Sequence, residues 1–275
     1  MTPTLRTRLT GGILLAIGAV IVLFPYYWLA VMATNTTGDI FTTPPKLTFG
    51  THLFDNIGEV LNRIDFFGSL LNTVIVSVAT TVLVLFFDSL AAFTFAKYAF
   101  PGRNVLFTIL LVTFVVPTQL SAIPQYSIMA SIGWVGDLKA LIVPAAANAF
   151  GIFWMRQYAA SAIPDELLEA AKVDGAGFFR TYWTVAMPIL RPALAFLGIF
   201  TFVTTWNDYL WPLIVMVDPS NTTLQVALNQ LNGLYGADYS LVMAGTLMAV
   251  IPLLVVFLFG ARHFIRNIAA GAVKG

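Results

Sequence analysis

Six long apolar segments constrain this chain more than any other feature of its sequence. Each holds roughly 20 mostly hydrophobic residues, the length that a helix needs to cross a bilayer. Hydrophobic residues make up 59% of the chain and charged residues 10%, whereas about a quarter of a soluble domain is charged. Lipid forces backbone groups to bond within each segment. The sequence therefore predicts an all-α, polytopic membrane protein, one domain over residues 1–275, with six transmembrane helices at 11–33, 70–96, 105–129, 138–155, 192–217 and 239–261.

The basic residues indicate how these helices are oriented. With the N-terminus inside, eleven of the 14 Lys and Arg lie in cytoplasmic segments, and only Lys46, Arg63 and Lys139 lie outside. Cytoplasmic loops carry such an excess, so we expect both termini in the cytoplasm. The first segment is longer than the roughly 7–15 residues of a signal-peptide core, and we expect it to be a retained helix.

The sequence lacks the residues that several kinds of catalytic and metal site require. There is no Cys, and the two histidines, His52 and His263, lie far apart, so we expect no disulfide and no metal site. The motifs G-x-x-x-x-G-K-[ST], H-E-x-x-H and G-x-S-x-G are all missing. We therefore expect no catalytic residue, no enzyme activity and no cofactor in this chain. The net charge of +1 gives no indication of a nucleic-acid partner.

The loop at residues 161–192 has signals for two short helices. Pro164 suits a first helical position, and acidic residues after it favour the positive end of a helix. Asp174-Gly175 is typical of a helix end, with Gly175 free to adopt positive φ. A second helix is expected from Phe178 to about residue 186, broken by Pro188.

Two interpretations of this loop stay open at this point. Its aromatic residues favour a helical hairpin lying in the lipid headgroups. The small residues Ala170, Ala171, Gly175 and Ala176 form instead a compact knob, which suits insertion into a cleft on another protein.

The segment EAAKVDGAGFFRTYWTVAMPILRP, residues 169–192, resembles the E-A-A…D-G-A…P…P loop of binding-protein-dependent ABC importer permeases. The resemblance implies the type I permease fold and a coupling helix seated in a groove of a nucleotide-binding subunit. The residues implied in ATPase coupling are Glu169, Ala170, Ala171, Asp174, Gly175 and Ala176.

Three further segments narrow this resemblance to the shorter permease of maltose-transporter-type sugar importers. They are KYAFPGRN at 97–104, WNDYLWPL at 206–213 and GAVKG at 271–275. The resemblance implies a second, related permease in a heterodimer, two ATPase subunits that bind ATP and Mg, an extracytoplasmic binding protein and a sugar substrate. It also implies a bacterial or archaeal plasma membrane location and a cytoplasmic tail at 262–275 that reaches toward the ATPase pair.

Polar residues inside the predicted helices are candidates for the translocation pathway, because they are costly in lipid and often mark function. Amides, a carboxylate and aromatic rings suit a sugar, which presents hydroxyls and apolar faces. The alternative for each is a hydrogen bond between helices. The candidates are Asn72, Gln119, Asn148, Trp206, Asn207, Asp208 and Trp211. For Asp88 we favour helix capping, or a pairing with Lys97 or Arg103.

The Gly-rich outer segment QLNGLYGADY, residues 230–239, is a candidate contact for the binding protein. Its named residues are Asn232, Gly233, Tyr235 and Gly236. Rival interpretations of the chain are a permease for another small solute such as a glycerol phosphate, half of a secondary transporter, and a membrane enzyme or assembly subunit.

Overall fold

The computed structural model describes residues 5–233 and 238–272, and every regular element in these two ranges is helical. The chain divides into two compact units, one of residues 1–66 and 227–252 and one of residues 67–226 and 253–275. Within these described ranges, four helices are long and apolar enough to cross a membrane, or five if one bent pair is a single span. The all-helical, polytopic class is confirmed. The count of six spans, the single domain and the placement of the termini stay predictions.

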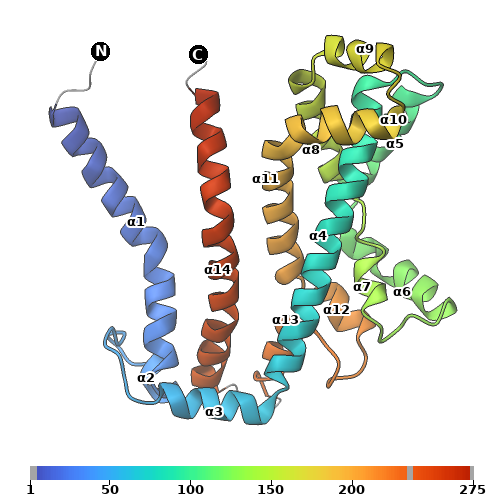
Figure 1. The fold of residues 1–275 in the computed structure, drawn as a ribbon. Coiled ribbons are helices and arrows are strands. Elements are labelled where there is room, and N and C mark those ends of the chain that lie inside the picture. Colours follow the sequence, from blue (N-terminus) through green and yellow to red (C-terminus); the bar gives the residue numbers. More distant parts are fainter. Residues whose placement is uncertain (1–4, 234–237, 273–275) are drawn as a thin grey trace. The chain divides into compact units, whose positions relative to one another are not determined.

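The first unit contains α1 (Leu5–Ala33), α2 (Thr37–Ile40), α3 (Leu53–Arg63) and the first part of α14 (Tyr239–Ala272). In Figure 1, α2 and α3 lie at the same end of the unit as the C-terminal end of α1. A small apolar core of Val31, Met32 and Ile40, with Trp28 and Met243 against it, joins α1, α2 and α14.

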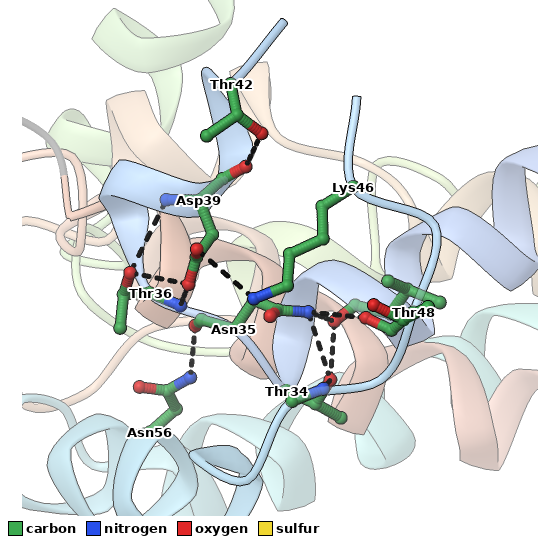
Figure 2. Close-up of polar contacts among 10 residues, drawn as sticks. Thr34, Asn35, Thr36, Asp39, Thr42, Lys46, Thr48 and Asn56 are labelled. Atoms are coloured by element: carbon green, nitrogen blue, oxygen red, sulfur yellow. Dashed lines mark hydrogen bonds and ion pairs between the residues drawn. The ribbon is translucent and has the colours of Figure 1, made fainter. Parts of the chain in front are cut away.

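A network of polar bonds orders the segment between α1 and α3 (Figure 2). The Asn35 Nδ2 donates to the carbonyl oxygens of Val31 (2.8 Å) and Thr48 (3.1 Å). The Asn56 Nδ2 donates to the carbonyls of Ala33 (2.9 Å) and Asn35 (3.1 Å). One buried amide thus fastens the segment to the end of α1, and a second one ties it to α3.

The short helix α2 is fixed at its N-terminus by a capping box. Thr36 Oγ1 and the Thr36 backbone N–H donate to Asp39 Oδ2 at 2.8 and 3.1 Å, and Lys46 Nζ lies 3.2 Å from Asp39 Oδ1. The hydrogen bonds from Thr36 and the nearby Lys46 ammonium lower the pKa of the Asp39 carboxyl. Asp39 therefore stays ionised and keeps accepting from this cap.

The second unit is built around α4 and α11, whose buried faces meet in its main core. That core includes Val84, Phe93, Met155, Tyr182 and Leu197. The short helices α9 and α10 lie at one end of α4, and α6, α7 and α12 lie toward the other end (Figure 1). The elements are α4 (Phe66–Lys97), α5 (Arg103–Val115), η1 (Thr118–Ser121), α6 (Ala122–Ser131), α7 (Lys139–Ile142), α8 (Ala149–Ala162), α9 (Asp165–Val173), α10 (Phe178–Thr181), η2 (Tyr182–Ala186), α11 (Met187–Trp206), α12 (Leu210–Val215) and α13 (Leu224–Asn229), which crosses into the first unit.

Three of the predicted spans differ from continuous helices. The segment 105–129 is broken after Val115 and bent by 93° before its second half. The segment 138–155 contains α7, a run of turns at 143–148 and the start of α8. Pro117 and Pro144 explain these two breaks, because proline lacks an N–H and disfavours helical geometry in the residue before it. In the segment 192–217, α11 ends at Trp206 and α12 begins at Leu210.

Candidate functional site

The knob expected from the sequence is present as α9 and the turn that follows it. The helix begins at Asp165 after Pro164, with Asp165 and Glu166 in its first turn and Lys172 in its last. These charges match the positive N-terminus and the negative C-terminus of a helix. The sequence therefore predicted the start of α9 to within one residue, with Pro164 at the cap position.

The turn after α9 is a Schellman motif. The Ala176 N–H donates to the Ala171 carbonyl (2.9 Å) and the Gly175 N–H donates to the Lys172 carbonyl (3.1 Å). Gly175 has φ of +71°, as the sequence predicted. Since a Cβ is disfavoured at this φ, glycine is the residue that allows the chain to reverse here.

Most of the predicted coupling residues are accessible. Glu169, Ala170, Asp174 and Gly175 are exposed. Ala176 is half-buried and Ala171 is buried. Larger apolar side chains stand out beside them, with Val173 88% and Phe179 62% exposed. The knob therefore presents small and apolar groups together, which suits contact with a protein or with lipid headgroups.

The second helix of the loop does not end at Pro188, so that prediction was wrong. Helical structure runs from Phe178 to Trp206 without a break. The π-helical turn η2 precedes Pro188, and there the Met187 N–H donates to the Tyr182 carbonyl, five residues back. Because the hydrogen-bond ladder has already shifted at this point, the missing N–H of proline is accommodated close to the start of α11.

Aromatic packing fastens the start of this long helix to α4. Phe93 lies 5.8 Å from Phe178 and 5.9 Å from Tyr182, between ring centroids. The Tyr182 hydroxyl lies 2.7 Å from Ser89 Oγ, and both residues are fully buried. The knob is therefore attached to a rigid base rather than to a free loop.

An ion pair joins α9 to the end of α4. Lys97 Nζ lies 2.7 Å from Asp165 Oδ1, and the Lys97 side chain is only 7% exposed whereas that of Asp165 is 77% exposed. Removing a carboxylate from a buried ammonium leaves an unpaired charge, which costs more than removing the ammonium itself.

We expect Asp165→Asn to lower the thermal stability of the purified transporter complex more than Lys97→Met does. Lys97→Met keeps the apolar stem and removes the charge, so the loss is about 1 kcal/mol or less. Adding Lys97→Met to Asp165→Asn should restore stability. Lys172→Met, an exposed change outside this ion pair, is the control. A larger loss of thermal stability in Lys97→Met than in Asp165→Asn would contradict this account of the ion pair.

Asp88 is fully buried in α4, and its predicted pairing with Lys97 or Arg103 was wrong. Its Oδ1 accepts the backbone N–H of Asn148 at 3.1 Å, and the Asn148 Oδ1 accepts the N–H of Gly151 at 2.8 Å. Asp88 thus supports the N-terminus of α8. Its Oδ2 has no hydrogen-bond partner among the described residues. The expected capping role is present, on a helix 60 residues further along the chain.

A cavity of about 440 Å³ lies toward the other end of the second unit. Its polar lining comes from α4, η1, α6, the end of α11 and the segments on either side of α12. The polar lining residues are Thr73, Gln119, Gln125, Thr204, Thr205, Asp208 and Thr223, and the apolar ones include Trp211, Leu141 and Pro144.

Of the predicted pathway residues, this cavity brings together Gln119, Asp208 and Trp211. The other four lie elsewhere. Asn72 donates to the Asn221 side chain and to the Thr222 carbonyl at 3.1 and 3.0 Å, and Asn148 caps α8. Trp206 is buried, stacked on Phe202 at 5.6 Å. The Asn207 side chain donates to the Val203 carbonyl at 2.8 Å.

Sequence reasoning missed the hydroxyl residues of the cavity. Thr73, Thr204, Thr205 and Thr223 were not singled out, because threonine is common in helices and its spacing does not show which face meets a cavity. The pair Thr204-Thr205, immediately before the predicted Trp206-Asn207-Asp208 cluster, was the available signal.

The outer candidate segment is described only in part. Asn232 Nδ2 donates to Asn229 Oδ1 at 3.1 Å, and Gly233 is exposed. Tyr235 and Gly236 lie outside the described residues. After them, Asp238 Oδ1 accepts from Thr37 Oγ1 at 2.5 Å and from Ser240 Oγ at 2.6 Å, which fastens the start of α14 to α2.

A match to a known sequence family identifies the class of protein to which this chain belongs. The family model described as "Binding-protein-dependent transport system inner membrane component" matches residues 89–269. The chain belongs to this family. The matched range contains the whole knob and most of the residues that line the cavity.

Known transport permeases resemble the chain over all or nearly all of its length. The lactose transport system permease protein LacG of Rhizobium radiobacter is 35% identical, with 100% of both chains covered. The arabinooligosaccharides permease protein AraQ of Halalkalibacterium halodurans is 30% identical, covering 100% of this chain and 98% of the relative. The sn-glycerol-3-phosphate permease protein UgpE of Yersinia pestis is 33% identical, covering 93% and 94%.

A solved structure supports the same assignment. The chain matches a bacterial ABC transporter involved in the import of the acidic polysaccharide alginate, with a TM-score of 0.79 and 25% identity over 96% of this chain and 99% of the other. The chain is therefore a multi-pass inner-membrane ABC permease, and the named relatives are transport permeases.

Proposed function

We propose that the chain is one permease subunit of an ATP-driven, binding-protein-dependent sugar importer. The observation that carries this proposal is the family match over residues 89–269, on a chain with the helical hairpin at 165–181. In this proposal the chain pairs with a second, related permease. Two ATPase subunits bind ATP and Mg, and a binding protein delivers the solute.

The knob at α9 supports the coupling part of the proposal. Its Schellman turn is rigid, its small residues are accessible, and its base packs on α4 and α11. Closure of the ATPases would move this knob, and the rigid base would carry the movement into the helices. A two-state rearrangement of the bundle is the expected response.

The relatives' names favour a sugar as solute. Lactose and arabinooligosaccharides are transported by the systems of LacG and AraQ, and alginate by that of the solved neighbour. UgpE serves a glycerol phosphate, which is an anion. The lining of the cavity contains Asp208 and, among the described residues, no Lys or Arg. Since phosphate binding needs cationic groups or free backbone N–H groups, this lining favours a neutral hydroxylated solute.

We expect ATP-dependent sugar uptake from the complete complex, this chain with its permease partner, ATPases and binding protein, in proteoliposomes. Thermal-shift screening of the binding protein against a panel of sugars, with glycerol 3-phosphate included, selects the solute. Uptake and stimulated ATP hydrolysis with a neutral sugar would support the proposal. Uptake of glycerol 3-phosphate alone would replace the sugar by the alternative solute.

A further inference from the structure

Two polar side chains that line the cavity make no hydrogen bond within the described part of the chain. They are Thr205 and Gln125, and both are half-buried. Their hydroxyl and amide groups are therefore accessible to a hydroxylated molecule in the cavity. Thr223 also lines the cavity, but its Oγ1 is buried and has no partner among the described residues.

The other walls of the cavity are held in place. The Trp211 Nε1–H donates to the Ala140 carbonyl at 2.9 Å, which fixes the indole ring against the cavity. The Asp208 carboxylate also lines the cavity, shortly before α12. The indole ring thus occupies a set position, and a ligand does not have to order it when it binds.

The size of the cavity also suits a ligand. Its volume of about 440 Å³ lies within the roughly 300–1,000 Å³ of small-molecule sites. No Lys or Arg lies among its described lining residues, so the lining is matched to a neutral molecule.

We propose that this cavity binds one sugar ring of the transported solute, which makes this subunit a direct contributor to solute recognition. The inference rests on the proposed sugar-import function. The Trp211 ring packs against the C–H face of the sugar. Thr205 and Gln125 exchange hydrogen bonds with its hydroxyls. The alternative is that the cavity holds only water. If it binds sugar, removing its hydrogen-bonding groups lowers sugar transport, whereas if it holds only water, transport does not change.

The test measures sugar transported per ATP hydrolysed in the complete reconstituted complex, at saturating sugar-loaded binding protein. Thr205→Val and Gln125→Leu each remove hydrogen-bonding groups with little change in volume. Losing one such bond weakens binding roughly 3- to 10-fold, so we expect a fall of that size for each variant and a larger fall for both together. Thr205→Ser, which keeps the hydroxyl, should retain wild-type transport.

Thr113→Val is the matched control, because the exposed Thr113 hydroxyl bonds the Leu110 carbonyl within its own helix at 2.7 Å, away from the cavity. It should leave transport unchanged. Assembly and basal ATP hydrolysis identify variants that fail to fold. A Thr205→Val, Gln125→Leu double variant that assembles and transports sugar at the wild-type ratio would overturn the inference and leave water as the occupant. A wild-type complex that transports no sugar would overturn the proposed function instead.

Discussion

Replacing Gly175 with valine is expected to abolish most of the ATP hydrolysis that loaded binding protein stimulates in the reconstituted complex. Gly175 has φ of +71° at the end of α9, where an L-residue costs about 1–2 kcal/mol and a β-branched one more. That shifts the population of the intact turn by a factor of roughly 5–30. The knob at 165–177 would then lose the shape by which we propose it receives the ATPase movement.

Two further variants distinguish the need for a left-handed conformation at residue 175 from a general effect of substitution in this turn. Gly175→Asn should retain most activity, because asparagine tolerates this left-handed conformation better than other residues. Gly177→Ala changes a glycine in the same turn whose φ is −72°, so it should be nearly neutral. Membrane insertion should be unaffected in all three. Full stimulation in Gly175→Val would refute the coupling role of the knob.

Replacing Gly151 with alanine is expected to destabilise the second unit strongly. A Cβ at Gly151 would overlap Asp88 Oδ2 and lie 3.2 Å from Leu197 Cδ1. Asp88 is fully buried and bonded to Asn148, so it has little room to move. Overpacking of this kind costs about 1–3 kcal/mol, and we expect a corresponding fall in the melting temperature of the purified complex.

A compensating change tests whether the cause is steric. Asp88→Ala removes the overlapping carboxylate, so it should lessen the effect of Gly151→Ala when the two are combined. Asp88→Asn keeps the volume of the side chain and should not lessen the effect of Gly151→Ala. Gly198→Ala is a suitable control, because its Cβ would meet Leu85 at an ordinary 3.4 Å. Equal melting temperatures for Gly151→Ala and Gly198→Ala would contradict the predicted clash.

The parts of the fold that were predictable from the sequence are those that depend on neighbours along the chain. The start of α9 and the positive φ of Gly175 follow from charges, proline and glycine within a few residues. Lipid-compatible length identified α1, α4 and α14 in the same way.

The parts that were mispredicted depend on distant residues. Asp88 supports the helix that begins beyond Asn148, and no local pattern links the two. Pro188 follows the rule for a helix break in isolation, but η2 and the packing of Tyr182 on Phe93 keep the helix continuous. Gln119, Asp208 and Trp211 of the cavity were predicted, but its threonines were missed for the same reason, since Thr73 and Thr223 meet only after the chain has folded.

The π-helical turn at Tyr182–Ala186 also determines how the helical residues before it are rotated about the helix axis. Each residue of an α-helix turns the chain by about 100°, and a π turn holds one residue more than an α turn. The wider turn absorbs its extra residue, because five π-helical residues turn the chain about as far as four α-helical ones. If the same five residues were regular α-helix, everything before them would be rotated by about that angle, carrying Phe178 away from Phe93. The π-helical form of this turn therefore sets the direction in which the knob faces.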